Sequence, residues 1–258
     1  MKAWLKYSIV TATVALLCGG VLILRHHSNE DKALIACRDM EISIKGEHQF
    51  VTEADVRAYI LNGYGQVAGQ KIDSIRLFRI EEMLDSKSAI LKSEAWTTRD
   101  GILHVSIEQR NPVARFDRQG GGFYVDDRGG IFPLHGTYTA PVPVIKGSIP
   151  VSTSPGYRGM APKPEERIWI GSILNLLGFM ERDREWRGKF PTMSVGANGD
   201  IVLQPAEGRE KFIFGPPDNF EAKFSRITEY YSRIAPSKEE GYYSSVNVKY
   251  NNQIVCRK

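Results

Sequence analysis

Residues 40–60, MEISIKGEHQFVTEADVRAYI, decide how the first half of this chain folds. Apolar and polar side chains alternate over residues 40–45, which is typical of a half-buried β-strand, and Gly46 ends the run. Thr52 precedes Asp55 by three residues, the spacing of a capping box at a helix N-terminus. One face of that helix would carry Ala54, Val56, Tyr59 and Ile60. The stretch therefore predicts a strand followed by a helix.

The segment after this helix predicts a second helix and a hairpin. Five apolar side chains recur there at helical spacing, namely Ile75, Leu77, Ile80, Met83 and Leu84. Residues 89–96 and 102–109 have the composition of strands, and the Asp100-Gly101 pair between them favours a tight hairpin turn. The predicted order over the first half is strand, helix, helix, strand, strand.

Beyond Asn111 the pattern changes to short strands separated by Gly, Asp and Asn, the residues that a reversing backbone favours. Strands are predicted at 113–116, 123–125, 131–133, 193–197, 201–203 and 211–214. Apolar residues at helical spacing predict helices over about 170–180 and 220–234. Residues 146–166 are rich in Gly, Pro and Ser and predict a long surface loop. A long strand at 243–250, an Asn251-Asn252 turn and a last strand at 253–256 complete the chain.

The N-terminal apolar run YSIVTATVALLCGGVLIL, residues 7–24, predicts a transmembrane helix. Its 18 uncharged residues span about 27 Å at helical rise, close to the thickness of a bilayer hydrocarbon core. A cleaved signal peptide is the alternative, because Lys2 and Lys6 precede the run. The basic residues that directly follow it, and the lack of a small-x-small cleavage site, favour an anchor preceded by a tail at residues 1–6. The positive-inside rule does not decide the orientation.

Composition indicates an ordinary globular protein after the anchor. Hydrophobic residues make up 42% and charged residues 25% of the chain, and the formal net charge is +4. Lys and Arg are scattered, so we expect no nucleic-acid partner. Cys18 lies in the predicted span, and Cys37 and Cys256 stand at opposite ends of the remainder. Both a disulfide between these two and a pair of free thiols are compatible with the sequence.

Candidate catalytic and metal-binding motifs are weak. Apart from the adjacent His26 and His27, no histidines have ligand spacing on a helix, so we expect neither a metal nor another cofactor. Asp126 and Asp127 could form a catalytic pair, but within the string DDRGG their role as turn formers is favoured. We therefore predict no catalytic residue.

The order strand, helix, helix, strand, strand, with IKGEHQFVTEADVRAYI at 44–60 and VSIEQRNPVARF at 105–116, resembles a POTRA domain. With a single N-terminal anchor, the chain resembles the cell-division protein FtsQ (DivIB) family, and FYVDDRGGIFPL at 123–134 resembles a hairpin of that family. The resemblance implies an α+β fold with a transmembrane helix, a POTRA domain at 38–110, and a mixed antiparallel β-domain with flanking helices at 111–258.

The resemblance also implies a function. Members of this family are bitopic, non-enzymatic scaffolds of bacterial cell division in the inner membrane, with a cytoplasmic N-terminus and periplasmic domains. Their implied partners are FtsB and FtsL, which such a scaffold links to septal peptidoglycan synthesis. The POTRA domain would bind further division proteins.

The last strand is the predicted binding site, because an edge strand offers unpaired backbone groups to which another chain can add a strand. In the family that the chain resembles, FtsB pairs with this terminal region. The predicted partner-binding residues are Lys249, Tyr250, Asn252, Gln253, Ile254, Val255 and Cys256.

Two other function classes share features with this sequence. A membrane-anchored enzyme of the cell envelope, acting on peptidoglycan or a secreted polypeptide, is the alternative and would need a cleft with an Asp, His or Ser cluster. Outer-membrane assembly proteins also use POTRA domains, but they need a long C-terminal run of barrel strands. The helices predicted after the hairpins, and the small number of residues left for barrel strands, exclude that class.

Overall fold

The structure, a computed structural model, describes residues 16–20 and 35–258. These form two compact units. Unit 1 comprises the described residues up to Gly46 together with Val51–Gln109, and unit 2 comprises Glu47–Phe50 and Arg110–Lys258. The predicted tail and most of the predicted span at 7–24 lie outside the described residues, of which 16–20 are helical. Within the described ranges, no helix is long and apolar enough to cross a membrane.

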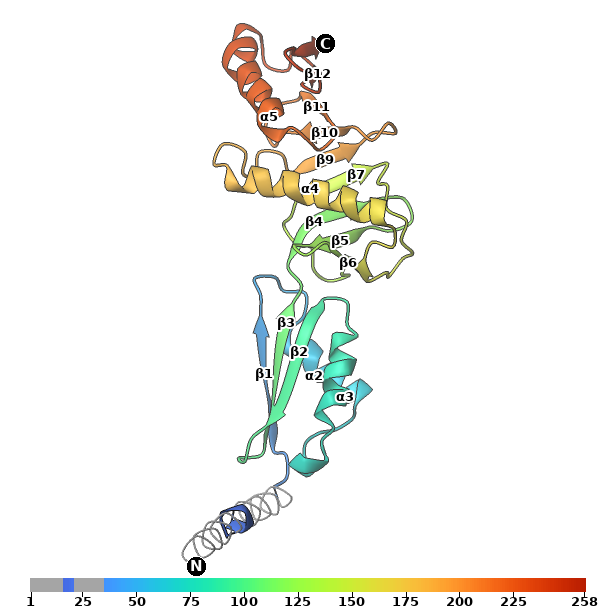
Figure 1. Ribbon diagram of the computed structural model, residues 1–258, viewed down its shortest axis with the longest axis vertical. Helices are drawn as coiled ribbons and strands as arrows, with labels where there is room; N and C mark the ends of the chain where they lie inside the picture. The colour runs from blue at the N-terminus through green and yellow to red at the C-terminus, as the bar shows by residue number, and fades with distance from the viewer. Residues whose placement is uncertain (1–15, 21–34) are drawn as a thin grey trace, which may run out of the picture. The chain divides into compact units, whose positions relative to one another are not determined.

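Unit 1 has the strand and helix order that the sequence predicts. Its elements are β1 (Asp39–Lys45), α2 (Glu53–Gly63), a 3-10 turn η1 (Ile72–Ser74), α3 (Leu77–Asp85), β2 (Ile90–Thr97) and β3 (Ile102–Gln109). β3 lies in the centre of the sheet, parallel to β1 and antiparallel to β2. α2 and α3 pack on one face of this sheet (Figure 1).

The capping box predicted at the start of α2 is confirmed. The Thr52 side chain accepts a hydrogen bond from the Asp55 N–H at 3.2 Å, and the Asp55 carboxylate accepts one from the Thr52 N–H at 2.9 Å. Two of the four residues predicted on the inner face of α2, Val56 and Ile60, are buried, whereas Ala54 is exposed. The two buried residues pack the helix onto the sheet, because burying apolar surface is the main driving force of folding.

Unit 2 contains one ten-stranded mixed sheet and two long helices. Its elements are β4 (Pro112–Asp117), β5 (Phe123–Asp126), β6 (Gly130–Pro133), β7 (Val144–Gly147), β8 (Gly159–Met160), α4 (Pro164–Arg182), β9 (Thr192–Val195), β10 (Ile201–Gln204), β11 (Lys211–Gly215), α5 (Phe220–Glu229), a π-helical turn η2 (Tyr230–Ile234), a 3-10 turn η3 (Ala235–Ser237), β12 (Ser245–Asn247) and β13 (Val255–Arg257). The strand order is β13-β12-β11-β10-β9-β7-β4-β5-β6-β8.

The helices of unit 2 share its core. Phe224 of α5 is 2% exposed, and its ring centroid lies 5.1 Å from that of Phe179 on α4 and 4.8 Å from that of Trp186. This aromatic cluster joins α4 and α5, which both pack against the sheet (Figure 1).

β7 is a strand that the sequence does not predict. It lies inside the sheet, between β4 and β9, and runs parallel to both. Pro141 and Pro143 precede β7, and Gly147 ends it with a φ of +96°. Only Val144 and Ile145 are apolar within the strand, which is too short a run to predict it from the sequence. The domain expected to be antiparallel therefore contains parallel pairs, including β11 with β12.

The surface loop predicted at 146–166 is partly wrong. β8 pairs with β6, α4 begins at Pro164, and Val151 and Ala161 are buried. The Glu166 carboxylate accepts a hydrogen bond from the Ser152 N–H at 3.0 Å. Burial alone would raise the pKa of Glu166, but the hydrogen bonds from Ser152 and Lys163 lower it below its usual value. These contacts fasten the loop to the start of α4.

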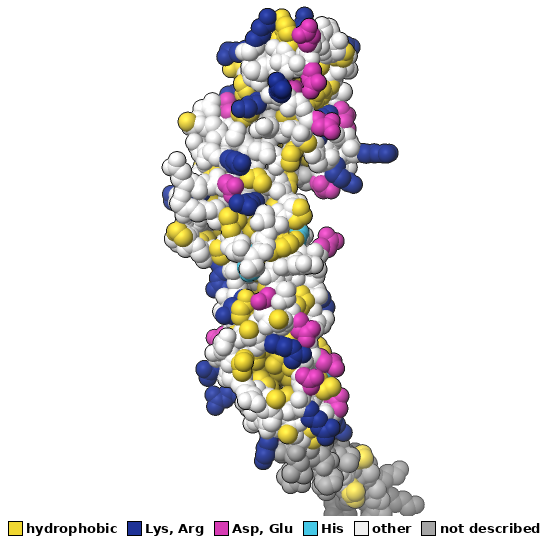
Figure 2. Space-filling model, turned by 180° about the vertical axis from the view of Figure 1, so that it is seen from behind, with side chains coloured by type: hydrophobic (Ala, Val, Ile, Leu, Met, Phe, Trp, Pro, Cys, Tyr) yellow, Lys and Arg dark blue, Asp and Glu magenta, His cyan; other side chains and the backbone are white. Residues whose placement is uncertain are grey.

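Surface charges are mixed in sign. Figure 2 shows one face of the molecule, on which Lys and Arg side chains are interspersed with Asp and Glu side chains over both units. That face has no stripe of basic side chains of the kind that binds a nucleic-acid backbone.

Candidate functional site: the C-terminal sheet edge

The C-terminal edge of the unit 2 sheet holds the residues that the sequence predicts as a partner-binding site. β13 is the terminal strand in the sheet order and pairs antiparallel with β12, where Cys256 lies opposite Val246. On its other side, no strand of the described residues pairs with it. β13 therefore presents a row of backbone N–H and C=O groups to which a further strand could bind.

Side chains of the terminal segment alternate between the core and solvent. Ile254 and Cys256 pack partly against the hydrophobic core of unit 2, whereas Val255 is 36% exposed and Arg257 is exposed. Burial raises the pKa of the Cys256 thiol. Cys37 of unit 1 and Cys256 of unit 2 are both free thiols in the structure.

Lys249 is held by an ion pair within the chain. Its Nζ lies 2.8 Å from Oδ2 and 2.9 Å from Oδ1 of Asp200, in the turn before β10. The hydrogen bond to Asp200 raises the pKa of Lys249 above its ordinary value. The aliphatic part of the Lys249 side chain packs against Gly215, where an added Cβ would come within 2.6 Å of Lys249 Cγ. Lys249 thus holds the segment that follows β12 against the turn before β10 and the end of β11.

Tyr250 and Asn252 lie between β12 and β13. Tyr250 is 49% exposed, and Lys249 Nζ is 5.9 Å from its ring centroid. Asn252 has a left-handed φ of +58°, a conformation that Asn tolerates better than most residues. Both Asn252 and Gln253 are exposed. The fold therefore places a half-exposed aromatic ring in the segment that leads from β12 to the open strand.

Two strand predictions in this region are wrong in extent. The long strand predicted at 243–250 is β12, which spans only Ser245–Asn247, and the last strand is Val255–Arg257 and not 253–256. The Asn247 side chain accepts a hydrogen bond from the Lys249 N–H at 3.0 Å. This local bond removes a donor from the ladder and bends the chain away from it.

Three residues that support the edge carry no functional signal in the sequence. Asp200 looks like a turn residue, and Gly215 looks like the end of a strand. Arg226 of α5 donates from Nε to the Val248 carbonyl at 2.9 Å, and its buried Nη2 has no hydrogen-bond partner. Their partners lie far away in sequence, so only the tertiary structure identifies these residues.

Asp126 and Asp127 do not form a joint carboxylate site. Asp126 is 3% exposed, and its carboxylate accepts hydrogen bonds from Arg110 Nη1 at 2.8 Å and from the Gly130 N–H at 2.7 Å. Asp127 is exposed and lines a separate cavity. Asp126 thus holds the turn between β5 and β6, the role that the DDRGG string favours.

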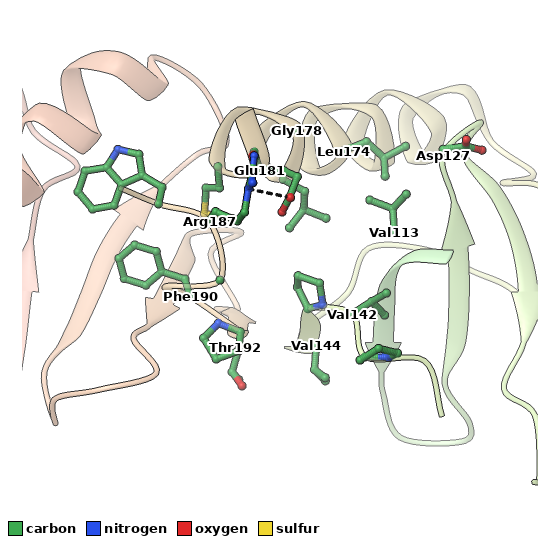
Figure 3. A pocket seen from close by; sticks show the side chains of 17 residues that line it. Val113, Asp127, Val142, Val144, Leu174, Gly178, Glu181, Arg187, Phe190 and Thr192 are labelled. Atoms are coloured by element: carbon green, nitrogen blue, oxygen red, sulfur yellow. Dashed lines mark hydrogen bonds and ion pairs between the residues drawn. The ribbon is translucent and has the colours of Figure 1, made fainter. Parts of the chain in front are cut away.

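That cavity, of about 750 Å³, lies between α4 and the segments that precede β7 and β9 (Figure 3). Its lining is mainly apolar and includes Leu174, Val142 and Phe190. Asp127 lies at one end, Phe190 lies toward the other, and an ion pair between Arg187 Nε and Glu181 Oε1 at 3.0 Å lies between them, close to α4 (Figure 3). The lining residues include no Ser, Cys or His to act as a nucleophile beside a base. Among the residues that the structure describes, no group of three His, Cys, Asp or Glu could hold a metal ion.

Comparison with known proteins agrees with this architecture. The family model "FtsQ/DivIB, C-terminal related" matches residues 111–257, more than half of the chain, and the model "POTRA-like domain" matches residues 35–108. The comparison with curated proteins found no match. With a POTRA domain followed by the matched C-terminal region, this chain belongs to the FtsQ/DivIB family of cell-division proteins.

Proposed function

We propose that this chain is a bitopic scaffold of the bacterial cell-division machinery. Residues 7–24 anchor it in the inner membrane, with the N-terminus in the cytoplasm and both units in the periplasm. It binds division proteins of the FtsB and FtsL type at its C-terminal edge and links them to septal peptidoglycan synthesis. It does so without catalysing a reaction and without a cofactor, and its POTRA domain binds other division proteins.

The open edge of β13 is the observation that carries this proposal. Backbone hydrogen bonds to an added strand supply affinity, and side chains beside the strand supply specificity. The exposed Val255 and Tyr250 are available for such contacts. Arg257 and Lys258 add positive charge that limits unselective pairing at the edge.

Binding of the full-length chain, in lipid nanodiscs, to the periplasmic segment of the FtsB-type protein from the same bacterium tests the proposal. We expect deletion of residues 253–258 to abolish binding, because it removes β13. We expect Tyr250→Glu to weaken binding at least tenfold, because a charge would replace an exposed ring at the edge. Interferometry on immobilised nanodiscs measures both affinities.

Phe78→Glu is the matched control. Phe78 is an aromatic residue of α3 in unit 1 and is 76% exposed, so the substitution makes the same chemical change away from the proposed site. It should leave the affinity within twofold of the wild type. Undiminished binding by the deletion variant would refute the edge as the binding site. A folded wild-type chain that does not bind would favour the alternative of an envelope enzyme.

A further inference from the structure

A second cavity lies beside the C-terminal edge. It has a volume of about 400 Å³, within the range of ligand-binding sites in proteins. Four tyrosines line it, Tyr230, Tyr231, Tyr242 and Tyr243, together with four glutamates, Glu207, Glu210, Glu239 and Glu240. One lysine, Lys238, also lines it. The lining therefore combines an excess of negative charge with aromatic faces.

Glu210 is the distinctive residue of this cavity, because its carboxylate is buried and the described residues form no ion pair with it. It is 8% exposed, and its Oε2 accepts a hydrogen bond from the Arg209 N–H at 3.0 Å. Its carboxylate also hydrogen-bonds the Tyr231 side chain. Among the described residues, Glu210 forms no ion pair with a Lys, Arg or His. A buried charge of this kind is costly until a cation compensates it.

The aromatic rings of the cavity already attract cations. The Lys258 ammonium lies 4.4 Å from the Tyr242 ring centroid, and Lys238 lies 5.4 Å from the same centroid. Lys189 lies 4.2 Å from the Tyr231 centroid. A ring face attracts a cation through its quadrupole, more strongly where water is excluded. Because lysines already lie over the Tyr231 and Tyr242 rings, the Glu210 carboxylate is the group of the cavity that a further cation would compensate.

The cavity is continuous with the proposed binding edge. Tyr243 stands two residues before β12, and Lys258, which contacts Tyr242, directly follows β13. Among the described residues, no group of three acidic, His or Cys side chains could hold a metal ion. An extended organic cation, which can contact rings and carboxylates at several points, fits this lining better than a metal ion.

We propose that this acidic tyrosine cavity receives a Lys or Arg side chain of the division protein that adds a strand to β13. The proposal rests on the proposed function and deepens it, because it specifies a chemical feature of the partner. The strand supplies backbone hydrogen bonds, and the basic side chain supplies selectivity, since a partner without it leaves the Glu210 charge uncompensated.

Double-mutant cycles with the full-length chain in nanodiscs test this inference. Each Lys and Arg in the periplasmic segment of the FtsB-type protein is replaced by Gln in turn, and each segment is titrated against the wild type and against Glu210→Gln. We expect one of these Gln substitutions to weaken the affinity for the wild-type chain at least tenfold. The same substitution should weaken the affinity for Glu210→Gln less than twofold. Glu221→Gln, which neutralises an exposed glutamate of α5 outside the cavity, is the matched control and should leave the tenfold loss unchanged.

A second variant keeps the test decisive if Glu210→Gln does not fold. Glu239→Gln combined with Glu240→Gln neutralises two exposed carboxylates of the cavity. It should reduce the loss at the same basic position at least threefold. Equal losses at every basic position against all variants would overturn the inference while leaving the proposed function intact. Absence of any binding, or binding that survives deletion of residues 253–258, would instead overturn the proposed function.

Discussion

Replacing Asp126 by Asn should destabilise unit 2 by about 3 kcal/mol. Asp126 Oδ1 accepts hydrogen bonds from the backbone N–H groups of Arg128 and Gly130, and Oδ2 accepts one from Arg110 Nη1. An Asn side chain has one acceptor oxygen, so when it keeps the two backbone bonds its NH2 group faces the Arg110 guanidinium. Breaking one partner of a buried ion pair costs about 3–5 kcal/mol. The Arg110 side chain is 19% exposed, so water offsets part of this cost and the lower value is expected.

Thermal unfolding of the full-length chain in detergent measures this loss. For a unit of this size, about 3 kcal/mol corresponds to a fall in Tm of about 6–12 °C. Tryptophan fluorescence follows the unfolding of unit 2 through Trp186, which is 3% exposed in its core, and a Trp96→Phe background removes the signal of unit 1. The exposed neighbour Asp127 provides the control, and Asp127→Asn should change the stability by no more than about 0.5 kcal/mol.

Replacement of Arg110 by Met in the Asp126→Asn background adds a second check. The double variant should regain part of the lost Tm, because it removes the cation that the first substitution leaves without a counter-ion. If Asp126→Asn melted within 2 °C of Asp127→Asn, the structural role assigned to the buried carboxylate would be wrong. A catalytic role for these carboxylates, as in the alternative of an envelope enzyme, would then have to be tested again.

Three further predictions concern other parts of unit 2. Hydrogen bonds lower the pKa of Glu166 below its ordinary value of 4.5, against the effect of burial. Its contribution to stability is therefore fully present above that ordinary value and is lost as the pH falls below it, through the lowered pKa of the folded state, so Glu166→Gln should flatten the acid limb of a plot of Tm against pH. Gly215→Ala should lower the free energy of unfolding more than Gly199→Ala does, because both glycines have a positive φ but an added Cβ meets Lys249 only at position 215. Chemical denaturation of the two variants measures both free energies. Burial, with the nearby negative charges, raises the pKa of Tyr230 to about 12, so the stability that its neutral phenol contributes is lost between about pH 10 and 12. In an ultraviolet titration, Tyr230→Phe should show one late-ionising phenol fewer than the wild type. An unchanged number of late-ionising phenols would contradict this environment of Tyr230.

Local sequence signals predicted the elements of unit 1 well because each depends on neighbouring residues. The capping box of Thr52 and Asp55 closes within one helical turn. The turn between β2 and β3 depends on Gly101, whose φ of +81° suits a residue without a side chain. Such interactions span a few residues and can be read from the chain directly.

Strand pairing in unit 2 depended on distant residues and was predicted less well. β7 has only two apolar residues between prolines and a glycine, yet it lies inside the sheet because β4 and β9 pair with both of its edges. In the same way, Val151 is buried in the hydrophobic core of unit 2, although the composition of residues 146–166 assigns it to a surface loop.

For the site, local sequence patterns were enough to predict a last strand after the Asn251-Asn252 turn, with Tyr250 directly before that turn. Its use in partner binding stays a prediction. Only the tertiary structure decided that this strand is an open edge, that Asp200 holds Lys249, and that Glu210 lies buried among four tyrosines. The physical reason is that an ion pair, a cavity wall or a sheet edge is made by groups far apart in the chain, whereas turns and caps are made by neighbours.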